Sequence, residues 1–306
     1  MLTTDLPFWL QRFSSAFAFG LMEAGFQKGD SLVMYCDQSS AAEALVAQMG
    51  AVKAGVQVVS FAEKDSAEAL EHALASTKAK GLLLNPEHAI DEKTTRGSFL
   101  HQLMPELSKM YFGDDLNLAR FPHLERVVQT KFSAIRGVNM YKDLAVYANP
   151  AYSSRQIPTN DASATAFVAL KDGKQTVYSS GELVEQAQAL WDSHLGKAAD
   201  SSAPVFMSCD LETPLGFASF LACTSNFKKV FIPGSYNMSS LLKALPTQNS
   251  SFLVCDSDFY NLEAPPQGNY QEMCSQVKNV LVAGTKGKSD LFAQANASAV
   301  DPLSLH

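Results

Sequence analysis

One glycine-rich basic segment has the composition of a phosphate-binding loop. Gly284-Thr285-Lys286-Gly287-Lys288-Ser289 follows the apolar run from Val280 to Ala283. A Walker loop, whose backbone amides and lysine hold nucleotide phosphates, also needs a glycine five residues before Gly287, and that position is Val282. The loop is therefore two residues too short. We interpret it as a solvated basic turn.

A second candidate lies between two apolar runs near the middle of the chain. The run from Ala166 to Leu170 leads into Lys171-Asp172-Gly173-Lys174 and continues from Gln175 to Tyr178. Asp-Gly between apolar runs favours a two-residue hairpin turn with positive φ. With one glycine and no cluster of Ser or Thr, such a turn cannot wrap a triphosphate.

The histidines and cysteines form no metal-binding pattern. His88 and His101 lack a ligand spacing, so we interpret them as surface or capping residues. The five cysteines include no C-x-x-C pair, and three of them end apolar runs, where a thiol packs as a small hydrophobe. The cysteines are Cys36, Cys209, Cys223, Cys255 and Cys274. We predict no metal site and a reducing compartment.

Composition excludes several classes of function. The 306 residues are 46% hydrophobic, which is enough for a large core in one or two domains. A net charge of −7 without a long basic run argues against nucleic-acid binding. A membrane-spanning helix needs about 18 consecutive apolar residues, and every apolar stretch in the sequence is much shorter. Without a secretory leader at the N-terminus, the chain is expected not to be secreted.

The segment from Ser31 to Phe61 predicts a strand, a helix and a second strand. The apolar runs Leu32–Cys36 and Val56–Phe61 lack polar alternation, as parallel strands buried on both faces do. Between them, Ser40 has capping-box spacing with the glutamate three residues on, and Gly55 favours the left-handed conformation that ends a helix. A helical crossover of this length makes the two strands parallel.

The later part of the chain repeats this pattern. Cys36-Asp37 ends the first apolar run, and Cys209-Asp210 ends a similar run 173 residues later. The same offset takes Val56 to Lys229, where another apolar run begins. The prediction is an α/β fold with two similar βαβαβ-type halves packed together.

The order of several short motifs resembles the adenylate-forming acyl-CoA synthetase family, also called the AMP-binding ligases. The residues from Gly25 to Asp30, GFQKGD, are similar to the family's GVKKGD, and those from Gly50 to Gly55 are similar to its ALKAG. Phe121–Val128 resembles the P-x-L-x-x-V-I strand that precedes the family's phosphate loop. The resemblance implies the fold of the family's large N-terminal domain.

The resemblance also implies a division of the chain. It assigns residues 56–200 to the first half and residues 1–55 together with 201–306 to the second, in one compact unit. In that arrangement Leu32–Cys36 pairs within the sheet that contains Pro204–Cys209 and Phe252–Cys255, rather than beside Val56–Phe61.

The resemblance aligns each of the two candidate loops with a known segment of the family. The family's phosphate loop, of the type T-S-G-T-T-G-x-P-K-G, falls where this chain has Asp172, Gly173 and Lys174. A G-G-A turn near the adenine falls at Gly284 and Thr285. The resemblance thus implies that these five residues are vestigial nucleotide-facing positions.

The chain departs from the family pattern in ways that bear on catalysis. It lacks the phosphate loop, and it ends before the family's Y-G-x-T-E segment, its hinge and its small C-terminal domain. Adenylation depends on positioned phosphates, a magnesium-coordinating carboxylate and a closing cationic domain. We therefore expect no catalytic residues and no cofactor.

These observations predict a non-catalytic, acyl-CoA synthetase-like pseudoenzyme that serves as a structural or accessory subunit of a larger protein assembly. The expected setting is a mitochondrial complex or, failing that, the cytoplasm. Two alternatives stay open. One is a module that binds an acyl group, CoA or a nucleotide, and the other is a ligase completed by another chain.

A partner surface is expected near the strand Val280–Ala283. The family domain continues beyond the position of residue 306, so apolar side chains near this strand are predicted to lie uncovered and to contact other protein subunits. Those predicted contacts are Leu241, Leu242, Leu281 and Phe292.

Overall fold

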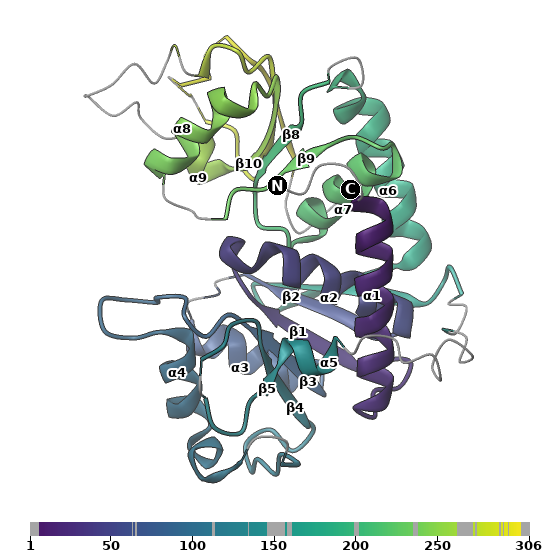
Figure 1. Cartoon of the computed structure of the whole chain (residues 1–306), viewed down its shortest axis with the longest axis vertical. Coiled ribbons are helices and arrows are strands. Elements are labelled where there is room, and N and C mark those ends of the chain that lie inside the picture. The colour runs from purple at the N-terminus through teal and green to yellow at the C-terminus, as the bar shows by residue number, and fades with distance from the viewer. Residues whose placement is uncertain are drawn as a thin grey trace. The chain divides into compact units, whose positions relative to one another are not determined.

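The computed structural model divides the chain into two compact units, which are labelled by element in Figure 1. Phe8–Gly181 form the N-terminal unit, and Glu182–His306 with Met1–Pro7 form the C-terminal unit. The structure describes residues 6–62, 64, 66–111, 114–133, 135–145, 157, 161–198, 202–234, 238–261, 272, 274–287, 289, 291–292 and 294–300.

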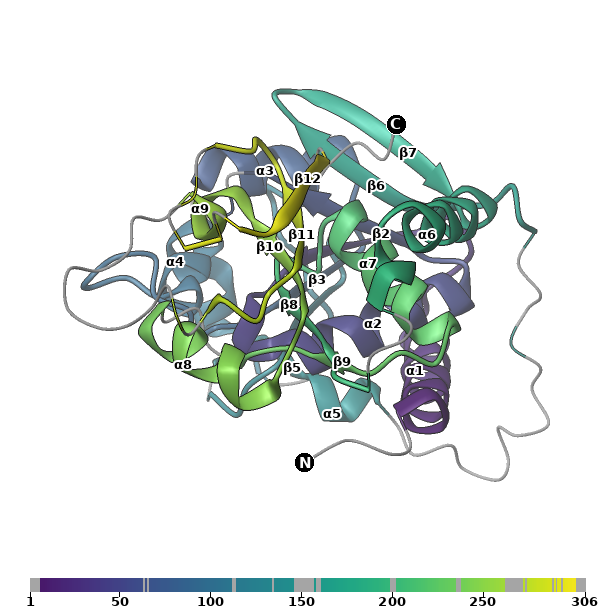
Figure 2. The ribbon, with the colours of Figure 1, turned by 90° about the horizontal axis from the view of Figure 1, so that it is seen from above.

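The N-terminal unit is built on a seven-stranded sheet in the order β5-β4-β3-β1-β2-β6-β7. All neighbouring strands are parallel except β6 and β7, which form the antiparallel hairpin seen in Figure 2. The strands are β1 (Ser31–Tyr35), β2 (Gln57–Phe61), β3 (Gly81–Leu84), β4 (Arg126–Gln129), β5 (Asn139–Met140), β6 (Thr165–Lys171) and β7 (Lys174–Ser179).

Helices join and cover the strands of this sheet (Figure 1). The helices are α1 (Leu6–Glu23), α2 (Ala41–Ala54), α3 (Ala67–Ser76), α4 (Arg96–Leu103) and α5 (Tyr141–Leu144), with 3₁₀ turns η1 (Gln38–Ser40) and η2 (Pro105–Lys109). Helices α1 and α2 meet at Gly50, where an added Cβ would lie 2.8 Å from the Ser14 carbonyl oxygen. Only glycine permits so close a contact between these helices.

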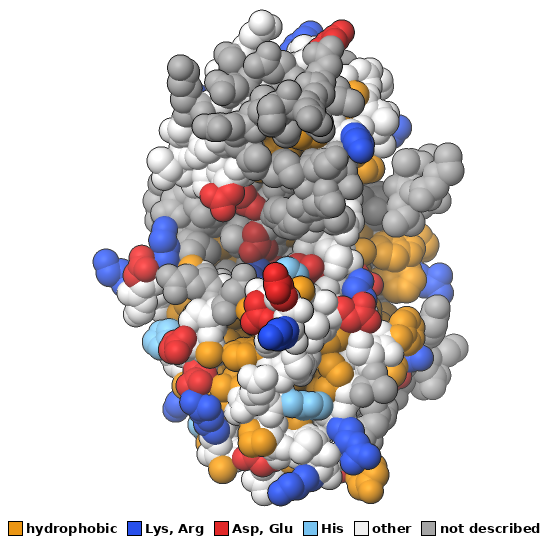
Figure 3. All heavy atoms as spheres, turned by 90° about the vertical axis from the view of Figure 1, so that its left-hand side faces the viewer, with side chains coloured by type: hydrophobic (Ala, Val, Ile, Leu, Met, Phe, Trp, Pro, Cys, Tyr) orange, Lys and Arg blue, Asp and Glu red, His pale blue; other side chains and the backbone are white. Residues whose placement is uncertain are grey.

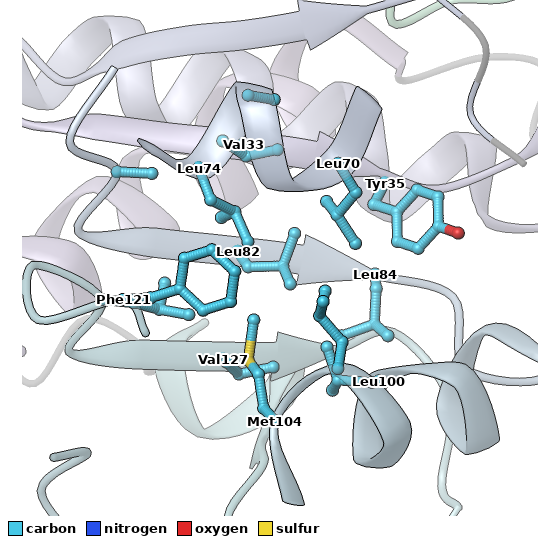
Figure 4. Packing of buried hydrophobic residues seen from close by; sticks show 14 of the residues in the cluster. Val33, Tyr35, Leu70, Leu74, Leu82, Leu84, Leu100, Met104, Phe121 and Val127 are labelled. Atoms are coloured by element: carbon cyan, nitrogen blue, oxygen red, sulfur yellow. The ribbon is translucent and has the colours of Figure 1, made fainter. Parts of the chain in front are cut away.

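Alternate residues of β1 and β3 face a core shared with α3 and α4. Figure 4 shows Val33, Tyr35, Leu82 and Leu84 packed against Leu70 and its neighbours on these helices. Each of these side chains is at most 1% exposed. Burial of one such aliphatic side chain stabilises the fold by about 1.5–3 kcal/mol, so this core is a main source of the unit's stability.

The expected position of β1 is wrong. Ser31 pairs with Gln57 of β2 and Leu32 with Gly81 of β3, so β1 lies beside Val56–Phe61 and not in the sheet of the C-terminal unit. The division of the chain differs accordingly from 56–200 against 1–55 with 201–306. The physical reason is the short α2 crossover, which returns the chain directly beside the strand it has just left.

Helix α2 begins and ends as predicted, but its capping box does not form. Gly55 takes the left-handed conformation with φ of 75° and ends the helix. Ser40 makes no side-chain capping bond, because its hydroxyl lies 2.8 Å from the Thr130 hydroxyl oxygen and is used there. The predicted partner Glu43 therefore does not complete a capping box with Ser40.

The C-terminal unit has a five-stranded parallel sheet in the order β12-β11-β10-β8-β9. Its strands are β8 (Val205–Ser208), β9 (Val230–Phe231), β10 (Phe252–Asp256), β11 (Asn279–Ala283) and β12 (Asn296–Val300). Its helical segments are α6 (Ser180–Ser193), η3 (Leu195–Ala198), α7 (Pro214–Ser225), α8 (Met238–Gln248) and α9 (Ser257–Tyr260). Among the residues that the structure describes, no helix is long and apolar enough to cross a bilayer.

The internal repeat is visible in the strand orders. The N-terminal unit contains β3-β1-β2 and the C-terminal unit contains β10-β8-β9, with a helix joining the first strand to the second in each. β2 begins at Gln57 and β9 at Val230, which are 173 residues apart, as the sequence offset predicts. The fold class of two similar α/β halves is therefore confirmed.

The predicted uncovered surface near β11 is wrong for the side chains that the structure describes. Leu242 and Leu281 are fully buried and Phe292 is 2% exposed. β12 pairs along the whole of β11, and the Phe259 and Tyr260 rings of α9 pack near Phe292. Leu242 belongs to α8, which packs on β8. The fourth predicted contact, the Leu241 side chain, lies outside the described part of the chain.

Candidate functional site

The tip of the β6–β7 hairpin is the two-residue turn that the sequence predicts. Lys171 pairs with Lys174, while Asp172 and Gly173 between them have φ of 50° and 70°. All four residues are exposed, and an added Cβ on Gly173 would meet no atom within 4 Å. A turn this short has no room to curve around a phosphate chain, because its two strands pair right up to it.

The Gly284 loop after β11 is held by bonds within its own unit. The Gly284 amide donates to the Val300 carbonyl oxygen at 2.8 Å, and the Gly287 amide donates to Asn261 Oδ1 at 2.8 Å. Lys286 Nζ donates to the Ala297 carbonyl oxygen at 2.7 Å. These donors are already used, which agrees with a structural turn. Thr285 is fixed in the same way, since its carbonyl oxygen accepts from Asn261 Nδ2 at 3.4 Å.

The two predicted sets of residues belong to different units. Asp172, Gly173 and Lys174 lie in the N-terminal unit, and Gly284 and Thr285 lie in the C-terminal unit. Each unit therefore contains one of the two sets. Their role as vestigial nucleotide-facing positions stays a prediction.

A polar cluster that the sequence analysis missed lies at the carboxyl edge of the N-terminal sheet. From β1 the chain continues to β2 on one side of that strand, and β3 then pairs on its other side. In open parallel sheets, ligands bind beyond the carboxyl ends of the strands at such a switch point. Asp37 follows β1 and Asn85 follows β3 at this place.

Asp37 is the centre of this cluster. Its Oδ1 accepts hydrogen bonds from Asn85 Nδ2 at 2.7 Å and from Ser39 Oγ at 3.0 Å. Its Oδ2 lies 2.9 Å from His88 Nδ1. Asn85 is buried, and its Oδ1 accepts from the Glu87 amide at 3.1 Å, which fixes the loop that follows β3.

These contacts set the ionisation of the cluster. Burial alone raises the pKa of the Asp37 carboxyl, but the hydrogen bonds from His88, Asn85 and Ser39 lower it by more. The net result is a pKa of Asp37 well below its usual range. Since the ionised carboxylate can only accept, the Nδ1 atom of His88 carries a hydrogen and donates it to Asp37.

A buried arginine supports the cluster from below. Arg96 is 2% exposed, and its Nη1 donates to the carbonyl oxygens of Tyr35 at 3.0 Å and Cys36 at 2.7 Å. Its guanidinium lies over the Tyr35 ring, 4.2 Å from the centroid. Because Arg96 donates to the last carbonyl group of β1 and to the one after it, it holds the backbone that leads to Asp37.

A cavity of about 310 Å³ opens beside the same loop. Its walls include Glu87, Ser98, His101 and Ser133, and the Ser133 hydroxyl donates to Glu87 Oε1 at 2.9 Å. The cavity is near the lower limit of size for a small-molecule site. Asp37 and Asn85 do not line this cavity, but Glu87 connects the two features, since its amide donates to Asn85 and the residue lines the cavity.

Metal binding has no support in the described residues, since no group of three or more His, Cys, Asp or Glu side chains is arranged to hold an ion there. On the face in Figure 3, acidic and basic side chains of the described residues are interspersed. That distribution differs from the continuous basic patch of a nucleic-acid interface.

Sequence reasoning could have found part of the polar cluster. Asp37 and Asn85 each follow an apolar strand directly, and the carboxyl ends of adjacent parallel strands lie at one edge. His88 was interpreted as a surface or capping residue. The His88 side chain is 30% exposed, and it also contacts Asp37 across 51 residues of sequence, which the sequence did not predict.

Comparison with known proteins finds likeness in structure only. No protein-family model and no curated protein matches the chain. The anthranilate CoA ligase AuaEII in complex with anthranoyl-AMP is 14% identical with a TM-score of 0.70, and the match covers 95% of this chain and 52% of that one. The luciferase-like enzyme of the mealworm Zophobas morio is 12% identical with a TM-score of 0.68, and the match covers 94% and 63%.

A third solved structure, ATP-bound MatB from Rhodopseudomonas palustris, is 15% identical with a TM-score of 0.64, and the match covers 90% of this chain and 48% of that one. The chain thus spans about half to two thirds of the length of the structures it matches. It has the fold found in acyl-CoA and related ligases, as the sequence resemblance implied.

Proposed function

We propose that this chain is a non-catalytic relative of the acyl-CoA ligases that acts as an accessory subunit of a larger protein assembly. The observation that supports this proposal is the Asp172-Gly173 turn, which stands where the resemblance places the phosphate loop. The shared fold supplies a scaffold, and the turn removes the part of it that adenylation needs most.

Adenylation depends on how the triphosphate of ATP is held. Transfer to a carboxylate requires the phosphates to be held in line and their developing charge to be stabilised by backbone amides, cations and a metal ion. Lys171 and Lys174 supply charge at the hairpin, but both are exposed. Point charges in water stabilise a transferring group far less than donors in a dry, pre-organised loop.

The catalytic half of the proposal is tested by pyrophosphate release from ATP and Mg²⁺ with a panel of aliphatic and aromatic carboxylates. We expect a rate no higher than that of a buffer control. A carboxylate-dependent rate above this control would overturn the proposal and favour a ligase, with or without a second chain.

The assembly half is tested in cells. We propose a mitochondrial complex as the setting, with the cytoplasm as the second choice. The five cysteines are buried and unbridged, which suits either reducing compartment. Native electrophoresis of fractionated cells should show the chain at a mass well above 33.1 kDa in the mitochondrial fraction. Migration only as a monomer would contradict the proposal.

A second candidate function is favoured by the polar cluster around Asp37 and the neighbouring cavity. These features suit a module that retains a small ligand, and the classes to test are acyl-CoA, CoA and nucleotides. Thermal-shift measurements with each compound decide between the two. A rise in Tm that Asp37→Asn abolishes would place ligand binding ahead of the accessory role.

A further inference from the structure

Helix α7 ends in an unusual residue. Asn226 is its C-cap, and the next residue, Phe227, takes the left-handed conformation with φ of 54°. The Phe227 amide donates to the Thr224 carbonyl oxygen at 3.2 Å, and the Lys228 amide donates to that of Cys223 at 2.8 Å. This is the Schellman pattern, in which glycine is strongly preferred at the position that Phe227 occupies.

Packing does not explain the choice of phenylalanine. The Phe227 side chain is 86% exposed, the largest exposure among the large hydrophobic residues that the structure describes. A bulky side chain in the left-handed region is strained, and an exposed aromatic ring gains little from burial in the chain itself. Backbone strain of this kind is commonly kept where a binding function needs it.

Helix α3 provides a matched comparison in the N-terminal unit. Lys78 holds the same Schellman position with φ of 48°, with bonds from Lys78 to Ala75 and from Ala79 to Leu74. Lys78 is exposed, and a charged side chain is favourable in contact with solvent. The two helix ends therefore share backbone geometry and differ in the side chain they present.

The chain beyond Phe227 offers further features of a binding surface. Lys228 and Lys229 come next, and Lys229 is exposed. They lead into β9, which pairs with β8 and, among the described strands, stands at the edge of its sheet. Val230, Phe231 and Ile232 are only partly buried. An aromatic anchor, a basic pair and an apolar strand edge thus follow one another within six residues.

We propose that Phe227, Lys229 and the edge of β9 form a docking site for an extended, acidic and apolar segment of a partner protein. This inference rests on the proposed accessory role and names the surface that serves it. The partner segment adds to the sheet edge through backbone hydrogen bonds, its carboxylates lie near the lysines, and Phe227 supplies the buried anchor.

Charge and geometry favour this occupant over two others. A second copy of the chain would bring the lysines of both copies into one interface, which like-charge repulsion disfavours. One aromatic ring and two lysines are also a weak membrane anchor, since each basic residue contributes only about 1 kcal/mol near an anionic surface. A strand edge contributes nothing to lipid binding but is a direct template for an extended peptide.

The test uses the full chain and a labelled peptide in which Glu alternates with Val, followed by fluorescence anisotropy. A peptide in which Lys alternates with Val is the control probe. The variants are Phe227→Gly, Lys78→Gly and Lys229→Glu. Phe227→Gly and Lys78→Gly remove the same backbone strain, so neither should lower Tm, and only the first removes the anchor.

We expect wild type and Lys78→Gly to bind the acidic peptide saturably, Phe227→Gly to bind it about tenfold more weakly, and Lys229→Glu to prefer the basic peptide. Absence of saturable binding by wild type overturns the inference, as does equal weakening by both glycine variants. Binding to phosphatidylserine vesicles that requires Phe227, without peptide binding, overturns it in favour of a membrane. None of these outcomes depends on pyrophosphate release, so failure here leaves the non-catalytic proposal intact.

Discussion

The two units share a strand topology but carry different polar side chains where the strands end. In the N-terminal unit, Asp37 follows β1 and receives side-chain hydrogen bonds, including that from Asn85 after β3. In the C-terminal unit, Asp210 follows β8, and its Oδ1 accepts from the Glu212 amide at 2.9 Å. The neighbour at the end of β10 is Asp256, whose Oδ1 accepts from the Asp210 amide at 3.4 Å.

The residue at the end of the neighbouring strand determines which hydrogen bonds a carboxylate at the switch point can make. Asn85 can donate to Asp37 and so joins it in a side-chain network. Asp256, when ionised, has no donor for Asp210, and each of these two carboxylates accepts from a backbone amide. Equivalent strand ends therefore carry a donor and an acceptor side chain in one unit and two carboxylates in the other.

Substitutions at equivalent positions of the two helices that follow these aspartates should differ most in their cost to stability. An added Cβ on Gly216, at the third position of α7, would overlap the Asp210 carbonyl oxygen. The equivalent residue of α2 is Glu43, which is partly exposed. Gly216→Ala should lower the unfolding free energy by about 3 kcal/mol and Glu43→Ala by less than about 0.5 kcal/mol in urea titrations. Similar values for both would contradict the comparison.

Arg96 should give the next largest effect. Arg96→Met leaves the carbonyl oxygens of Tyr35 and Cys36 without this donor in a buried position, so we expect a loss of about 2–3 kcal/mol in the unfolding free energy. Arg120→Met is the matched control, since Arg120 is exposed and pairs with Glu71 at the surface. A loss below about 1 kcal/mol for Arg96→Met would show that Arg96 does not support β1.

Asp37 should make stability depend on acid. Its pKa is lowered in the folded state, so its stabilising contribution is complete above the unfolded pKa of about 3.9 and is lost as pH falls below that value. Asp37→Asn should cost about 1–2 kcal/mol at pH 7 and flatten the decline in stability below about pH 4. Calorimetry across this pH range measures both effects. If the stability of Asp37→Asn fell below about pH 4 as steeply as that of wild type, the proposed ionisation of Asp37 would be contradicted.

The hairpin should give the smallest effects. Gly173→Ala has room for its methyl group but must keep a φ of 70°, so we expect a loss of about 1 kcal/mol. Lys174→Ala changes an exposed side chain and should stay within about 0.5 kcal/mol. A large cost for Lys174→Ala would mean that this lysine has a structural role absent from the comparison.

Local signals in the sequence predicted much of this fold. The apolar runs around α2, the left-handed Gly55 and the Asp172-Gly173 turn depend on neighbours in the chain, so pattern and residue type suffice for them. The repeat offset also located β9 correctly. Pairing of β1 with β2 and β3 was predicted wrongly because it followed the resemblance rather than the short crossover.

The polar cluster was beyond such signals. His88 reaches Asp37, and Ser40 reaches Thr130, only after the loops that follow the strands have folded. The covering of β11 likewise depends on β12, a short run of small residues with no strong strand pattern. Contacts between side chains that are far apart in sequence can be identified only from the structure.

The non-catalytic proposal depends on the Asp172-Gly173 turn being unable to hold a triphosphate. The most direct measurement is isothermal titration of ATP with Mg²⁺ into the full chain. We predict no saturable heat, and the same result for a variant with Lys171→Ala and Lys174→Ala together. Saturable ATP binding that this double variant abolishes would overturn the non-catalytic proposal, because the hairpin would then be a phosphate site after all.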